Sequence, residues 1–344
     1  MTCRRTEHVG MRDMQFQRLQ HRTESSRAVL VKGAAATAFP QATEAAIALL
    51  RQGGNAIDAA VAAAWMLSVC EPSASGLGGQ TTLLFYSASG EARIIDGHSY
   101  APAGVSVDTV TEKQQRLGHR ACVIPSTPAT LAYAQRCYGD LPVAVSLAPA
   151  IRVAREGYAI TPLQHRQATW FERQMHVSPA IAKLFLLDGA PPPVGHVFRQ
   201  PELACTLQRM ADVGVEDFYS GLVAHAIVAD MQRNGGLLNA DDLAGFSLPV
   251  ERKAVEIRYR ENRVLSAPAP GGGQNLLFAL KVLERLVPNQ GHAVGEDSWR
   301  EAIAMASYCT FRERERRDSQ RLWEEHGDSI DFLGMSKSNE QQSD

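Results

Sequence analysis

Few residues of this chain stand in a pattern that would carry chemistry on its own. The ten histidines are dispersed without an HExxH pattern, and the six cysteines form no CxxC pair. We therefore expect neither a metal site nor a cofactor. Ser99 and Ser126 lack the GxSxG context of a serine nucleophile. The sequence does not predict a self-contained serine hydrolase.

Two other motifs invite a functional interpretation. Asp241 and Asp242 could form a carboxylate pair, but adjacent helical residues point in different directions, and capping of a helix start is the favoured role. Ser75–Gly79 is rich in glycine, yet it follows a predicted helix and precedes a predicted strand. A dinucleotide site requires the reverse order, so a backbone turn is favoured. Nucleotide binding remains an alternative that rests on these glycines alone.

Composition indicates a globular chain. Of 344 residues, 45% are hydrophobic and 21% are charged, with a formal net charge of −2. Without a dominant basic block, nucleic acid is not expected as a partner. The apolar run Ala56–Cys70 is too short for a membrane span. Unpaired cysteines and an N-terminus that shows no apolar signal-peptide region predict a cytoplasmic location.

The hydrophobic pattern predicts an alternation of helices and hairpins. Apolar residues between Ala42 and Leu50 have helical spacing and end at Gly53-Gly54, and Ala56–Cys70 reads as a helix buried on all sides. Strands at Thr81–Ser87 and Glu91–Asp96 form a hairpin. Further elements are expected as helices from Pro128 to about Tyr138, from Leu141 to Gly157 with a restart at Pro149, from Gln200, from Phe218 to Gln232 and from Gln274, and as a strand pair between Val255 and Pro268.

Several ordered blocks match one protein family. They are Gln52–Val61, Glu71-Pro72, Ser75–Gly79 and the Asp96…Ala101-Pro102 element. Their order resembles that of the large chain of the γ-glutamyltranspeptidases, and the resemblance runs from about Ala28 to Asp318. It implies an N-terminal-nucleophile (Ntn) hydrolase, that is, an enzyme whose nucleophile becomes a chain terminus after self-cleavage.

The resemblance also implies that the nucleophile is absent from this chain. Members of the family cut themselves before a threonine, usually within Thr-Thr-His, whereas the only Thr-Thr here is Thr81-Thr82, followed by Leu83. An N-terminal threonine can react because its own α-amine, with a pKa of about 8, accepts the hydroxyl proton. That threonine and most substrate-binding groups would lie on a separate small subunit. No catalytic residue is assigned in this chain.

One residue here is expected to contact the substrate. In the family, an arginine follows the hairpin aspartate and holds the α-carboxylate of the glutamyl donor, and His98 stands in its place. An imidazole lacks the guanidinium fork and is only partly charged near neutral pH, so the resemblance implies a weaker carboxylate clamp. Alternatively, His98 only completes the edge of the hairpin. The substitution leaves room for amides other than a glutathione-like donor.

These observations predict a layered α/β (α+β) chain, the large-subunit part of a four-layer αββα Ntn-hydrolase sandwich that a small subunit completes. We expect a mobile extension at 1–27, one domain at 28–330 and a polar tail at 331–344, the tail resembling a segment before a cleavage point. The expected activity is hydrolysis or acyl transfer at γ-glutamyl or related amides such as glutathione. The alternatives are a noncatalytic paralogue or scaffold, and an acylase with a non-glutamyl substrate.

Overall fold

The computed structural model of the chain describes residues 33–246, 248–287 and 296–326. Helices make up 53% of the residues and strands 12%, so the expected mixed class, α/β (α+β), is confirmed. The chain divides into two units: the first contains residues 1–79 and 99–246 and the second residues 80–98 and 247–344, as far as these are described. The expected extension at 1–27 and tail at 331–344 lie outside the described residues.

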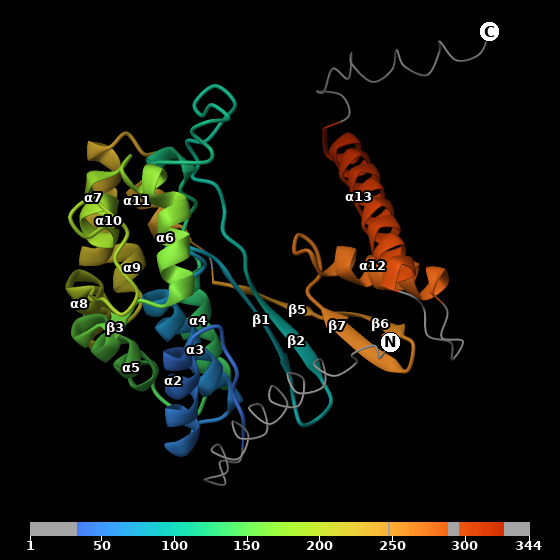
Figure 1. The fold of residues 1–344 in the computed structure, drawn as a ribbon, viewed down its shortest axis with the longest axis horizontal. Coiled ribbons are helices and arrows are strands. Elements are labelled where there is room, and N and C mark those ends of the chain that lie inside the picture. The colour runs from blue at the N-terminus through green and yellow to red at the C-terminus, as the bar shows by residue number, and fades with distance from the viewer. Residues whose placement is uncertain (1–32, 247, 288–295, 327–344) are drawn as a thin grey trace, which may run out of the picture. The chain divides into compact units, whose positions relative to one another are not determined.

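The first unit is helical, and it begins with two helices that the sequence predicted. In α2 (Pro40–Arg51), Ala42, Ala45, Ala46 and Leu49 are buried, and the helix is followed by Gly53, whose φ of 91° favours glycine. Helix α3 (Ala56–Cys70) packs against α2 (Figure 1), and its polar residues Asp58 and Ser68 are buried along with most of the apolar ones. The prediction of a helix buried on all sides was wrong for one face, because Ala56 and Ala60 are exposed there and Ala64 and Leu67 are only partly buried.

Asp58 joins three helices through a buried carboxylate. Its Oδ2 accepts the backbone N–H of Asn55 (2.8 Å) and of Asp140 (2.9 Å), and its Oδ1 accepts Nε2 of Gln135 (3.0 Å) and the N–H of Leu141 (3.1 Å). The side chain is fully buried. Four donors therefore replace water around this charge, and they tie the start of α3 to the turn between α4 (Thr127–Tyr138) and α5 (Val143–Glu156).

Two predictions about helix breaks were wrong. Helix α5 runs through Pro149 without the expected restart. A proline removes one backbone donor, and the helix continues because Leu147, Ala150 and Ile151 bury its apolar face. The single helix expected from Phe218 to Gln232 is instead two, α9 (Asp217–Ser220) and α10 (Leu222–Arg233), divided at Gly221.

The carboxylate of Asp217 explains the break at Gly221. It accepts Nε and a terminal nitrogen of Arg209 at 2.8 and 2.7 Å, and it caps α10 through the backbone N–H groups of Leu222 (3.2 Å) and Val223 (3.1 Å). A Cβ at position 221 would lie 2.0 Å from Oδ1 of Asp217. The capping carboxylate occupies the space that any larger residue would need.

The rest of the first unit forms around these helices. It contains the 3₁₀ turn η1 (His119–Ala121), β3 (Tyr158–Ala159), α6 (Pro162–Met175), α7 (Pro179–Phe185), β4 (Val197–Phe198), α8 (Pro201–Val213) and α11 (Ala240–Ala244). Strands β3 and β4 pair in an antiparallel bridge. Helix α8 packs on α5, burying Ala204, Leu207 and Met210.

The second unit contains the hairpins. Strands β1 (Thr81–Tyr86), β2 (Ala92–Gly97) and β5 (Val250–Lys253) form an antiparallel sheet in that order, drawn in teal and orange in Figure 1. A second hairpin pairs β6 (Val255–Tyr259) with β7 (Asn262–Ser266). Helix α12 (Gly273–Leu286) packs on this hairpin and on α13 (Glu296–His326). Both predicted hairpins are confirmed. In the described part of the chain, no helix combines the length and apolar character of a membrane span.

We predict that Asp58→Asn lowers the free energy of unfolding by roughly 2–3 kcal/mol, because an amide NH₂ would face buried N–H donors that lose their acceptor. Urea unfolding measures the change. The matched control is Asp140→Asn, since that side chain is exposed in the same turn. Equal stability of the two variants would contradict a structural role for the buried carboxylate.

The pKa of Asp217 gives a prediction about pH. The hydrogen bond from Arg209, aided by the N–H groups of Val223 and Leu222, lowers this pKa from 3.8 to about 2. The stabilisation is therefore complete above about pH 5 and is lost as the pH falls from about 4 towards 2. We expect the stability difference between the parent chain and Asp217→Asn to shrink over that interval. In the control Asp212→Asn, whose side chain is exposed, a similar trend would count against this assignment.

Candidate functional site

The residue predicted to contact substrate follows strand β2 directly. Asp96 and Gly97 are the last buried residues of the strand, and the side chain of His98 is 24% exposed. The site is thus built where a paired strand ends, so that the backbone of β2 fixes the position of the imidazole. This placement agrees with a binding role but does not test it.

The buried carboxylate of Asp96 orients His98. Its Oδ1 accepts the backbone N–H of His98 at 3.2 Å and also contacts the ring nitrogen Nδ1. A carboxylate accepts a hydrogen bond from a protonated Nδ1, which fixes the ring orientation and leaves Nε2 for another partner. Within the described residues, Nε2 of His98 has no hydrogen-bond partner.

A second cation meets the same carboxylate from the neighbouring strand. Nε of Arg252 lies 2.7 Å from Oδ2 of Asp96, whose side chain is only 5% exposed. In the register of β2 with β5, Ile94 is opposite Arg252 and Asp96 is opposite Val250, so Arg252 and Asp96 lie on one face of the sheet. One carboxylate therefore holds an imidazole and a guanidinium together.

A glycine turn lies beside the imidazole. A Cβ built at Gly271 would lie 3.7 Å from Cε1 of His98, so the turn between β7 and α12 approaches the ring closely. Gly273 is required there, because its Cβ would be 2.1 Å from the carbonyl oxygen of Ala267. The sequence gave no sign that Pro268–Gly273 borders His98.

This arrangement can bind an anion, but it holds no nucleophile. Arg252 presents N–H donors beside the imidazole of His98, and a guanidinium suits the two oxygens of a carboxylate. The reacting group of a hydrolase would have to come from elsewhere. Sequence reasoning proposed His98 and did not single out Arg252, because only the pairing of two strands far apart in the chain brings that residue next to Asp96.

The other sequence candidates have structural roles. Asp242 caps α11 by accepting the N–H of Asn239 at 3.0 Å, as predicted, and it also accepts the N–H of Ala103 at 2.9 Å. Ser75–Gly79 forms turns in which the N–H of Gly79 donates to the carbonyl of Gly76. Within the described residues, no group of three or more potential ligands could hold a metal. Burial raises the pKa of the Cys70 thiol to about 12, which suits packing rather than reactivity.

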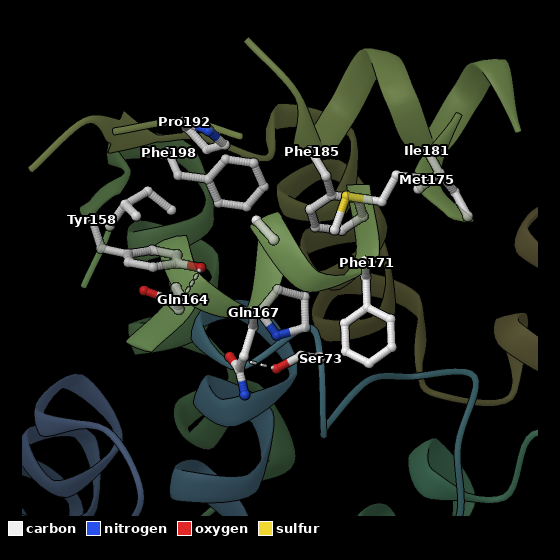
Figure 2. A pocket seen from close by; sticks show the side chains of 13 residues that line it. Ser73, Tyr158, Gln164, Gln167, Phe171, Met175, Ile181, Phe185, Pro192 and Phe198 are labelled. Atoms are coloured by element: carbon white, nitrogen blue, oxygen red, sulfur yellow. Dashed lines mark hydrogen bonds between the residues drawn. The ribbon is translucent and has the colours of Figure 1, made fainter. Parts of the chain in front are cut away.

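An apolar pocket in the first unit was not predicted. Its volume is about 340 Å³, and Figure 2 shows Phe171, Phe185 and Phe198 around it. Its polar residues are already bonded: Nε2 of Gln164 donates to Tyr158 (3.0 Å), and Ser73 donates to Gln167 (3.1 Å). The pocket offers hydrophobic contact without a group poised for chemistry. The only sequence signal was apolar residues at helical spacing in α6 and α7.

Comparisons with known proteins agree on one family. The family profile described as gamma-glutamyltranspeptidase matches residues 42–324. The glutathione hydrolase proenzyme of Escherichia coli strain K12 is 32% identical over 262 residues, which cover 74% of this chain and 45% of that protein. The chain spans somewhat less than half the length of the curated relatives that it matches.

Solved structures show the same similarity. The crystal structure of Helicobacter pylori gamma-glutamyltranspeptidase aligns with a TM-score of 0.78 and 29% identity over 84% of each chain. The cephalosporin acylase from Bacillus halodurans aligns with a TM-score of 0.70 and 32% identity, covering 78% of this chain and 52% of that one. The fold expected from the sequence is confirmed.

Proposed function

Because the chain belongs to the gamma-glutamyltranspeptidase family and covers its large-subunit portion, we propose that it is part of a γ-glutamyl hydrolase or transferase. The observation that carries this proposal is the profile match over residues 42–324, together with the structural alignment over 84% of the chain. The substrate would be a small amide with a γ-glutamyl group, such as glutathione.

The nucleophile in this proposal is the N-terminal threonine of a small subunit that pairs with this chain. Its hydroxyl attacks the amide carbonyl carbon, the amine leaves with a proton, and the acyl group then passes from the threonine oxygen to water or to another amine. The chain described here would bind and orient the donor, which accelerates reaction by holding the carbonyl close to the nucleophile.

Exposed apolar residues in the second unit support a partner. They are found on helices α12 and α13, which pack together, and they include Leu276, Ile303, Met305, Tyr308 and Phe311. Phe311 is 62% exposed. A second chain could bury these residues. A small subunit would supply that cover.

We assign His98 to the donor carboxylate within this proposal. A γ-glutamyl group carries a free α-carboxylate, and Nε2 of His98 could donate to it when the ring is protonated. A second candidate activity is acylase chemistry on a non-glutamyl amide. It is favoured by the alignment with a cephalosporin acylase and by an imidazole at the position where the family resemblance implies an arginine.

The first prediction from this proposal concerns the location of the nucleophile. The purified chain alone should not hydrolyse a γ-glutamyl anilide, because it lacks a Thr-Thr-His processing site, whereas the chain produced together with its small subunit should do so. Release of the aniline measures the activity. A small-subunit variant with the leading threonine changed to alanine is the control. Turnover by the isolated chain, free of contaminating enzyme, would refute the assignment.

The second prediction concerns His98. In the assembled enzyme, His98→Arg should lower KM for γ-glutamyl donors by a factor corresponding to roughly 1–2 kcal/mol, because a permanent cation makes charge-assisted bonds that imidazole makes only when protonated. His98→Ala should raise KM for the same donors, because it removes the imidazole that would contact their carboxylate. Steady-state kinetics measure both. Unchanged KM in both variants would reduce His98 to a hairpin residue.

A further inference from the structure

The guanidinium of Arg252 has unused hydrogen-bonding capacity. Its Nε lies 2.7 Å from Oδ2 of Asp96, and the side chain is 41% exposed. In the described part of the chain, Asp96 is the only residue that forms an ion pair or hydrogen bond with this guanidinium. The outer edge of the guanidinium can therefore donate two parallel hydrogen bonds to a planar anion.

We propose that Arg252 binds the substrate carboxylate together with His98, and that this arginine provides most of the selectivity for donors that carry a carboxylate. The inference rests on the proposed function for the identity of the substrate. In this proposal, the guanidinium of the site comes from Arg252 on strand β5, whereas the residue directly after β2, His98, contributes an imidazole.

A comparison with Arg93 shows why Arg252 is suited to a ligand. Arg93 lies on the other face of the same sheet, where its guanidinium is paired with the partly exposed carboxylates of Glu91 (3.1 Å) and Glu251 (3.3 Å). Arg252 instead shares one buried carboxylate with His98. Two acidic groups already offset the charge of Arg93, whereas Asp96 is divided between two donors.

The charges around Asp96 favour a single negative charge on the ligand. Asp96 carries −1 and Arg252 carries +1, so the cluster is neutral with neutral His98 and has a charge of +1 when that ring is protonated. The carboxylate of Asp96 is 5% exposed and faces its two partners. A bound monoanion is balanced when the cluster carries +1, whereas a dianionic phosphate would leave excess negative charge in either state.

The test compares two donors in the assembled enzyme. They are a γ-glutamyl anilide and the 4-aminobutyryl anilide, which is identical except that it lacks the carboxylate. Arg252→Gln should raise KM about tenfold for the first donor, the scale of one lost charge-assisted bond, and leave KM for the second unchanged. The matched control Arg93→Gln removes the same charge from the neighbouring strand and should change neither KM.

Arg252→Lys separates binding from a structural role. Lysine keeps a positive charge that can pair with Asp96, so it should preserve folding, but it lacks the guanidinium fork. If Arg252 only holds β5 to β2, lysine restores KM for the γ-glutamyl donor. If Arg252 binds the carboxylate, the lysine variant retains most of the increase in KM. Full restoration by lysine, or an equal rise for both donors, would overturn the inference.

A binding titration keeps this test separate from the proposed activity. In the full chain, NMR signals of the His98 ring, assigned with His98→Gln, are followed while either anilide is added. We expect the γ-glutamyl compound alone to shift these signals, with about tenfold weaker affinity in Arg252→Gln. If no anilide is hydrolysed, the proposed function fails, but a carboxylate-dependent shift still supports the inference. Equal titrations by both compounds, or no effect of Arg252→Gln, would overturn it.

Discussion

The buried carboxylate of Asp96 is the group on which both the end of the β2–β5 pairing and the candidate site depend. It ends β2 by accepting the N–H of His98, and it joins β2 to β5 through Arg252 at 2.7 Å. A charge with 5% exposure requires such partners, since desolvation without them would be strongly unfavourable. The requirement for partners thus brings the imidazole of His98, directly after β2, and the guanidinium of Arg252 on β5 to one point, and the fold creates the candidate binding surface while satisfying its own aspartate.

A comparison of Asp96 with Asp58 separates a binding site from a structural one. Asp58 is fully buried, and its acceptors are filled by three backbone N–H groups and the amide of Gln135. None of these donors has capacity to spare for a ligand. Besides the backbone N–H of His98, the partners of Asp96 are the partly exposed side chains of His98 and Arg252, and the guanidinium of Arg252 keeps free donors. Both aspartates belong to family-like blocks of sequence, so the motif alone does not distinguish these roles; the identity and exposure of the donors do.

The sequence correctly predicted the helices and hairpins that are determined by a local pattern of residues. Helical spacing and terminal glycines located α2 and α3, and alternation with turn residues located both hairpins. The helix break at Gly221 was not predicted, because it depends on the carboxylate of Asp217, which lies against the start of α10. Arg252 was not singled out, because β2 and β5 are more than 150 residues apart in the chain. The family resemblance supplied His98, which spacing alone would not have singled out. The cytoplasmic location and the domain limits stay predictions.

The position of Arg252 bears on how one fold can serve two kinds of amide. Arg252 lies on β5, and its orientation is set by Asp96 and by the β2–β5 register. It therefore depends less on the sequence of the β1–β2 hairpin than a cation at position 98 would. A change at the end of β2 can then alter the shape of the donor site without removing the guanidinium. If the carboxylate is read by β5, a histidine at position 98 is compatible with a γ-glutamyl substrate, and the acylase alternative must be judged by the depth and polarity of the region beyond the carboxylate.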